Sequence, residues 1–256
     1  MPSVLHGEIP MKRSVTAANE APAAGAPRTI AEATYQRLRQ DIIWGRLPPD
    51  APLRSDELRT TYAVGISPLR EALSRLMAER LVTAIGQRGF RVAPLTADDV
   101  MDVTETRLVI EKHALARSIR DGDVAWEREI VASFHTLSHG PFPLGPGPAM
   151  EQWVNFHRQF HMALIAACGS RWQIELASQL FDQAERHRAV RATIVPEGKL
   201  KRDVTAEHQE IYEATLARNT KAAVTALESH YRTTAEHVLT ALQHAPKLKK
   251  KGAPEK

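Results

Sequence analysis

The sequence has a single cysteine, Cys168, and no long apolar run. One thiol excludes an internal disulfide and fits a reducing compartment, so we expect a cytoplasmic protein. Without a long apolar run there is no candidate membrane span, and the positive charges at residues 12–13 lack the apolar core that follows them in a signal peptide. With 43% hydrophobic and 25% charged residues, the composition is typical of a soluble globular protein.

Lysine is absent from residues 28–91, where eleven arginines stand against seven acidic residues. This excess accounts for the whole formal charge of +4, because the rest of the chain is neutral by the same count. Positive charge is therefore concentrated in the N-terminal quarter, which modestly favours a nucleic-acid partner for that segment.

Both ends of the chain have the composition of solvated tails. Residues 1–27 are rich in Ala, Pro, Gly and Ser without hydrophobic periodicity, and we expect them to be disordered. Residues 244–256 form a basic tail with four lysines between 247 and 251.

Between the tails, residues 28–95 predict three helices followed by a hairpin. Thr29 is a candidate cap for the first helix, which the proline pair 48–49 ends, and Ser55 is a candidate cap for the second. Ser67 and Pro68 are expected to open the third helix, since proline is favoured in a first helical turn. Two β-prone runs, 81–85 and 90–92, then flank a glycine turn. This order predicts a winged helix-turn-helix domain.

From Thr96 onward the pattern is almost wholly helical, which predicts a second, all-α domain over 96–243 and a mainly α fold for the chain. Thr96 and Asp99 resemble a capping box at its start. The Gly/Pro-rich segment 140–148 is expected to be a loop. The expected helices are 97–120, 123–138, 149–168, 171–192, 199–217 and 220–243.

The third helix is the candidate DNA reader. Ser67 and the first amides of the helix can bind a phosphate. The guanidinium of Arg70 can donate two hydrogen bonds to the O6 and N7 atoms of guanine. Arg75 lies on the expected exposed face of the same helix. Arg88 and Gly89, at the hairpin tip, suit a wing that enters a minor groove. The alternative is a solvated surface with scattered arginines.

Four histidines are candidate metal ligands. His157 and His161 are four residues apart, so both lie on one helix face and can chelate a divalent metal. His208 and His230 fall on later helices, and a helical barrel could bring all four together with one or two coordination positions left open. Four neutral nitrogens favour Zn²⁺, Ni²⁺ or Cu²⁺ over Mg²⁺ or Ca²⁺, and zinc is preferred on availability. Taken singly, each histidine is more often a surface or packing residue.

The N-terminal segment resembles the GntR family of bacterial regulators. The resemblance rests on the runs 35–49, 67–76, 79–82 and 88–92. It implies a winged helix-turn-helix that binds DNA as a homodimer. One departure is Ile66, where relatives often have an arginine that contacts DNA.

The helical segment resembles the ligand-binding domain called FCD in the FadR-type branch of that family. The matching residues are Arg107, Glu111, the run 160–167, Glu207, His208, Ile211, Tyr212 and His230. The resemblance implies a metal and a small organic acid, with Arg107 as the partner of its carboxylate. The alternative for Arg107 is an ion pair with Glu111. Many relatives have aspartate at the position of His157, so this chain is an all-histidine version.

These observations predict a ligand-responsive transcription regulator that is not an enzyme. A homodimer would bind a palindromic operator as a repressor and leave it when a small carboxylate binds near the metal. One alternative is an architectural DNA-binding protein without effector or metal. Another is a metal-dependent enzyme, for which the sequence offers no general base at motif spacing.

Overall fold

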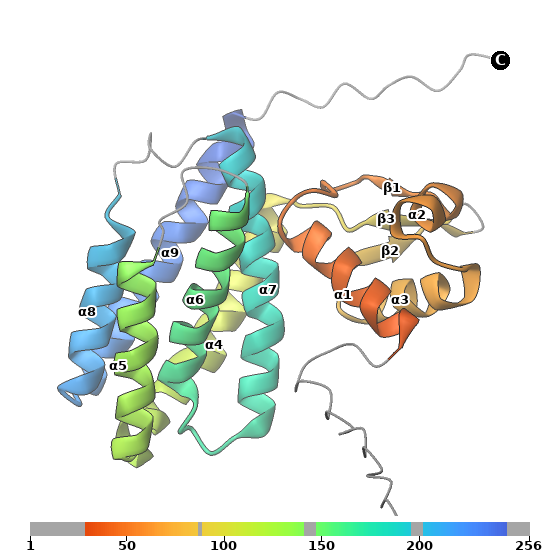
Figure 1. Ribbon diagram of the computed structural model, residues 1–256. Helices are drawn as coiled ribbons and strands as arrows, with labels where there is room; N and C mark the ends of the chain where they lie inside the picture. The colour runs from red at the N-terminus through yellow and green to blue at the C-terminus, as the bar shows by residue number, and fades with distance from the viewer. Residues whose placement is uncertain (1–28, 87–88, 141–146, 196–201, 245–256) are drawn as a thin grey trace, which may run out of the picture.

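The computed structural model describes residues 29–86, 89–140, 147–195 and 202–244. Within these ranges the chain is mainly helical, and it forms a small N-terminal part beside a larger bundle of helices (Figure 1). No helix in the described part of the chain is long and apolar enough to cross a membrane.

The small part packs helices against a short antiparallel sheet, and its described strands lie in the order β1-β3-β2. Leu38 of the first helix meets Leu69, Leu73 and Leu76 of the third in a buried core. Such burial contributes about 1.5–3 kcal/mol per leucine side chain. The elements are α1 (Ile30–Ile43), β1 (Pro52–Leu53), α2 (Ser55–Tyr62), α3 (Ile66–Ala78), β2 (Val82–Ala84) and β3 (Phe90–Val92).

The ends of these helices confirm one expected cap, correct another and move the start of α3 to Ile66. The Thr29 side chain accepts a hydrogen bond from the Glu32 amide, as expected for α1. Ser55 is instead the first helical residue of α2, and α3 begins at Ile66, so Ser67 is also inside its helix. The preceding backbone is already extended at Arg54 and Gly65, and therefore these residues take the cap positions without a side-chain bond.

The larger part is a bundle built around a second apolar core. Its first helix begins with the expected capping box of Thr96 and Asp99. The helices match the expected ones within a few residues, except that α6 ends at Ile165 and α8 begins only at Val204. They are α4 (Ala97–Asp121), α5 (Val124–His139), α6 (Pro148–Ile165), α7 (Arg171–Ile194), α8 (Val204–Leu216) and α9 (Thr220–His244). The predicted tails and most of the predicted 140–148 loop lie outside the described residues.

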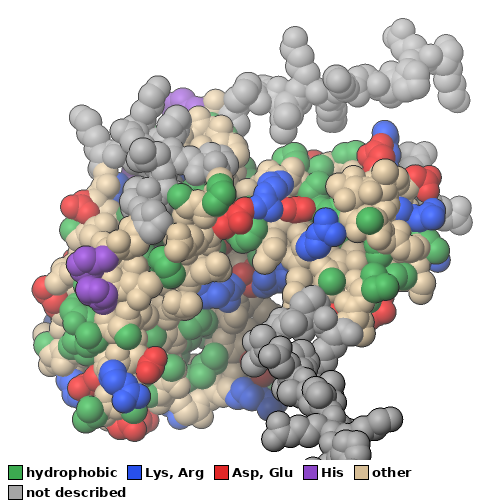
Figure 2. Space-filling view, in the orientation of Figure 1, with side chains coloured by type: hydrophobic (Ala, Val, Ile, Leu, Met, Phe, Trp, Pro, Cys, Tyr) green, Lys and Arg blue, Asp and Glu red, His purple; other side chains and the backbone are tan. Residues whose placement is uncertain are grey.

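Helix α7 is the part of the bundle that lies against the small part (Figure 1). Asp182 on α7 pairs with Arg39 on α1, and the Gln183 side chain donates to the Glu79 carbonyl at 2.8 Å. Arg186 donates to the backbone carbonyls of residues 93 and 94, which connect the two parts. Basic and acidic side chains also lie side by side along the junction in Figure 2.

Candidate metal site, effector cavity and DNA-reading face

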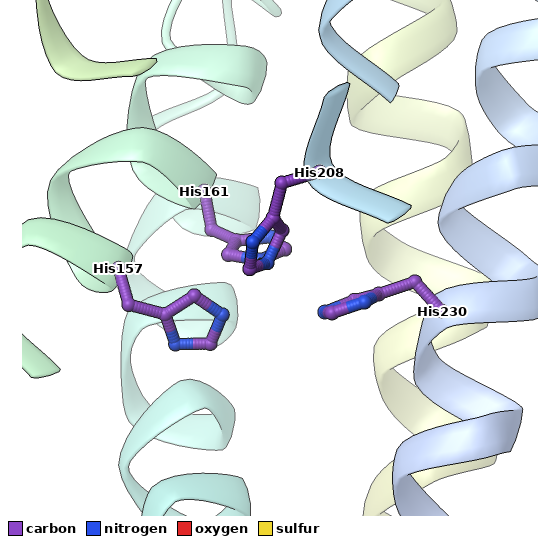
Figure 3. Close-up of side chains that lie close together, drawn as sticks. All are labelled: His157, His161, His208 and His230. Carbon is purple, nitrogen blue, oxygen red and sulfur yellow. The ribbon is translucent and has the colours of Figure 1, made fainter. Parts of the chain in front are cut away.

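The structure brings the four candidate histidines together inside the bundle (Figure 3). His157 and His161 come from α6, His208 from α8 and His230 from α9, and all four side chains are buried. One ring nitrogen from each lies within 4.8 Å of the others. Three helices thus direct imidazole nitrogens at one point.

Carboxylates orient two of these rings. Nδ1 of His157 lies 2.9 Å from Oε1 of Glu185, and Nδ1 of His230 lies 2.7 Å from Oε2 of Glu207. A carboxylate only accepts hydrogen bonds, so each Nδ1 carries the proton and donates it. The lone pair is then on Nε2, which is the arrangement found when histidine binds a metal.

Tyr231 orients His161 in the same way. The Tyr231 hydroxyl donates to Oε2 of Glu111 at 2.5 Å, so its oxygen is left to accept from Nδ1 of His161 at 3.1 Å. This bond places the lone pair of His161 on Nε2 as well.

The inner nitrogens fit a transition-metal ion. Nε2 of His157 is buried and has no hydrogen-bond partner among the described residues. Nε2 of His161 lies 3.3 Å from Nε2 of His208. Two nitrogens bound to zinc at about 2.0–2.1 Å, at the tetrahedral angle, are about 3.3–3.4 Å apart. Both the buried lone pair and this separation therefore suit a shared cation.

Burial also keeps the four rings neutral. Removal from water lowers the pKa of His157 to about 4 and holds the pKa values of His161, His208 and His230 below the ordinary 6.5. Neutral imidazole is the form that binds a metal, so the rings need not lose a proton near neutral pH.

The carboxylates behind the rings remain ionised. Burial alone would raise the pKa of Glu185, but Arg188 and His157 together outweigh it and hold this pKa far below its usual range. The pKa of Glu207 is lowered to about 2, because hydrogen bonds from Arg202 and His230 outweigh its burial. Each carboxylate thus has one arginine and one histidine as partners.

A small cavity of about 40 Å³ opens beside the histidines and is rich in arginine. Arg107 lines it, as the effector prediction requires, and also forms the alternative ion pair: its Nε donates to Oε1 of Glu111 at 2.7 Å. The guanidinium lies over the Tyr231 ring, 3.8 Å from its centre. The ion pair and the cavity position therefore coexist.

Sequence reasoning missed several residues of this site. Glu185 and Arg188 lie on α7, which carries none of the four histidines, so no motif spacing connects them to His157. Arg202 precedes α8 and was expected inside a helix. Glu185 and Arg188 are three residues apart on one helix face, but this spacing is common in helices without a site.

The expected DNA-reading face is exposed on α3. Ser67, Arg70, Glu71 and Ser74 follow helical spacing, and all four are exposed. Among the described residues Arg70 makes no ion pair, which leaves its guanidinium available.

The structure describes two of the remaining predicted DNA contacts, Arg75 and Gly89. Arg75 pairs with Glu32 and lies over the Tyr35 ring, 3.8 Å from its centre, so it joins α3 to α1. Gly89, directly before β3, has a φ of +100°, a backbone angle that favours glycine. Arg88 lies outside the described residues.

Comparison with known proteins gives matches to both parts. Residues 30–92 match the family model of bacterial regulatory proteins of the gntR family, and residues 102–233 match that of the FCD domain.

Two relatives resemble the chain over most of its length. The HTH-type transcriptional regulator BphR of Paraburkholderia xenovorans is 38% identical over 205 residues, which are 79% of this chain and 82% of that protein. The HTH-type transcriptional repressor GlaR of Escherichia coli is 36% identical over 201 residues, 78% of this chain and 91% of that protein. The solved structure of McbR/YncC from E. coli has the same fold, with a TM-score of 0.70 and 18% identity over 84% of this chain and 99% of that one.

Proposed function

The chain belongs to the GntR family of bacterial regulators, in the branch that carries an FCD domain, and on that premise we propose that it is a homodimeric repressor released by a small carboxylate. As a member of this family it is a DNA-binding transcriptional regulator. The observation that carries the effector part of the proposal is the buried four-histidine cluster beside an arginine-lined cavity. The repressor part is supported by the E. coli relative, which is named a repressor.

On the DNA side, α3 enters the major groove. The guanidinium of Arg70 donates two hydrogen bonds to guanine, and Ser67 with the first amides of the helix binds a phosphate. Arg88 and Gly89 of the wing contact the adjacent minor groove. Arg75 has the smaller role of holding α3 against α1, because Glu32 and Tyr35 already engage its guanidinium. Two copies of the chain place two such helices on the halves of a palindromic operator.

On the effector side, His157, His161, His208 and His230 hold a divalent metal, for which zinc is the first choice and Ni²⁺ the second. An ion held there would supply positive charge for one carboxylate oxygen, which would join the four imidazoles as an additional ligand. Arg107 holds the same carboxylate. Its bonds to Glu111 use Nε and Nη2, and therefore Nη1 is left to donate.

Helix α7 connects this site to the DNA-binding part. Glu185 binds His157, whereas one turn earlier Asp182 binds Arg39 of α1. Arg186, next to Glu185, holds the connecting segment through the carbonyls of residues 93 and 94. An effector that binds one placement of α7 more tightly than another would shift the placement of the DNA-reading helices by that difference in affinity.

The test combines metal analysis with DNA binding. Purified wild-type protein is expected to contain one metal ion per chain, and His161→Ala is expected to lose it. His135→Ala, an exposed histidine on α5, is the matched control and should keep the metal. Unchanged metal content in His161→Ala would refute the site.

The second measurement is a gel shift on the DNA that flanks the gene. Wild-type protein should bind it and be released by a short-chain carboxylate. An architectural protein would bind DNA but respond to neither the carboxylate nor the metal, and an enzyme would turn the carboxylate over.

A further inference from the structure

The exposed side of α3 carries one large apolar side chain, Ile66. It is the first residue of the helix, and 46% of its surface is exposed. Among the described residues of the small part, the other exposed large hydrophobic side chain is Ile30, in the first turn of α1. Leu69 and Leu73 of α3 are fully buried in the core. Ile66 instead leaves apolar surface in water at the end of the helix that is proposed to enter the groove.

Ile66 lies in the same row of side chains as Arg70. Ile66, Arg70 and Ser74 are four residues apart and all exposed, so they follow one another along the outer side of α3. One helical turn advances about 5.4 Å, whereas successive base pairs of DNA lie about 3.4 Å apart. A base that faces Ile66 is therefore about one or two steps from the guanine proposed for Arg70.

The start of α3 allows close approach to DNA. The residue before Ile66 is Gly65, which has no side chain, and no side-chain hydrogen bond caps the helix there. The first turn of α3 also contains no acidic residue that would repel a phosphate. The isoleucine side chain can therefore reach the edges of the bases without a neighbouring side chain before it in the way.

An aliphatic side chain distinguishes the bases by one group in the major groove, the C5 methyl of thymine. Isoleucine neither donates nor accepts hydrogen bonds. Against guanine, adenine or cytosine it would cover polar atoms without pairing them, and this costs free energy. Against thymine it buries a methyl group together with its own exposed surface. Of the four bases, thymine thus fits Ile66 best.

We propose that Ile66 contacts the methyl group of a thymine about one or two steps from the guanine that Arg70 binds, and that this contact selects thymine in the operator half-site. The inference rests on the proposed placement of α3 in the major groove, and it adds a second base to what this helix recognises. Deoxyuridine lacks the methyl group but pairs like thymine, so exchanging one for the other isolates the contact.

The first measurement uses duplexes that the full chain selects from a random DNA library. Wild-type protein should select a half-site with a guanine that Arg70→Ala no longer requires and with a thymine about one or two steps away. Deoxyuridine in place of that thymine should weaken wild-type binding about fourfold, the effect expected for one buried methyl group. Ile66→Ala should bind the thymine and deoxyuridine duplexes equally well.

Two further variants locate the contact. Ile30→Ala removes the exposed isoleucine of α1, and as the matched control it should keep the wild-type preference for thymine over deoxyuridine. Ile66→Arg should select guanine in place of the thymine, because a guanidinium donates to O6 and N7 of that base. Thermal unfolding of each variant shows whether the fold is intact, and if Ile66→Ala does not fold, Ile66→Arg carries the test.

The methyl contact is overturned if wild type and Ile66→Ala respond equally to deoxyuridine at every thymine of the half-site. It is also overturned if folded Ile66→Arg still selects the thymine. Neither result affects the role proposed for Arg70, which its own variant tests. If the full chain selects no sequence from the library, the proposed DNA contacts of α3 fail as well.

Discussion

Removal of the metal should destabilise the bundle by several kcal/mol. The perturbation is chelation of the purified protein, followed by return of zinc. Without an ion, Nε2 of His157 is a buried lone pair with no partner among the described residues, and a group of this kind costs about 1–3 kcal/mol. Nε2 of His161 also lies 3.3 Å from Nε2 of His208, so an ion bound between them would take the place of this contact.

The gain on binding follows from linkage. Free zinc at about 1,000 times its dissociation constant stabilises the native state by about 4 kcal/mol, which includes the relief of the buried nitrogen. For a protein of this size, each kcal/mol raises the midpoint of thermal unfolding by about 2–4 °C. We therefore expect the midpoint to rise by about 8–16 °C when zinc is returned.

Circular dichroism at 222 nm, which reports helix, is the assay, with chelated and zinc-loaded samples measured side by side. His161→Ala should show no rise with zinc, whereas His135→Ala should rise like the wild type. If the chelated and loaded wild-type proteins unfold at the same temperature, the reasoning from the buried nitrogens is refuted.

Three further predictions concern other parts of the molecule. Arg70→Ala should weaken operator binding by about 1–3 kcal/mol and relax the preference for guanine. Equal gel shifts for the variant and the wild type at several salt concentrations would show that another residue contacts the base. Asp182→Asn leaves Arg39 and Arg158 without the carboxylate that they share. Because both arginines are about one-quarter exposed, we expect the free energy of unfolding, measured by chemical denaturation, to fall by only about 1–3 kcal/mol. An unchanged free energy would mean that solvent already screens these ion pairs. Burial lowers the pKa of His187 from 6.5 to about 3, so the native state keeps this ring neutral while the unfolded chain takes up a proton as the pH falls below 6.5. Stability from this group is thus full above pH 6.5 and about 1.4 kcal/mol lower at about pH 5.5, and the pH dependence of His187→Leu should be weaker by that amount.

Local features of the sequence predicted much of the fold. Thr29 and the Thr96–Asp99 box mark helix starts because a cap bond joins residues only three apart. The helix-period leucines of α3 form the core face, as their spacing predicts. The sequence did not predict strand β1, because two residues show no alternation. This strand depends on pairing with β3, about forty residues later in the chain.

The candidate site was partly readable in the same way. His157 and His161 form a pair by helical spacing alone, whereas His208 and His230 needed the resemblance to a known family. Arg75 shows the limit of spacing. Its place on the helix suggests exposure, but Glu32 and the Tyr35 ring on the neighbouring helix engage it.

The sequence by itself determined that a winged helix-turn-helix segment precedes a helical domain with a histidine pair, because these features depend on neighbours within a few residues. Only the tertiary structure decided which carboxylates hold the imidazoles and which arginines share their cavity. Glu185 meets His157 across 28 residues, and Glu207 meets His230 across 23. Such contacts depend on how the bundle helices pack, and α7 carries both a partner of His157 and the ion pair to the DNA-binding part.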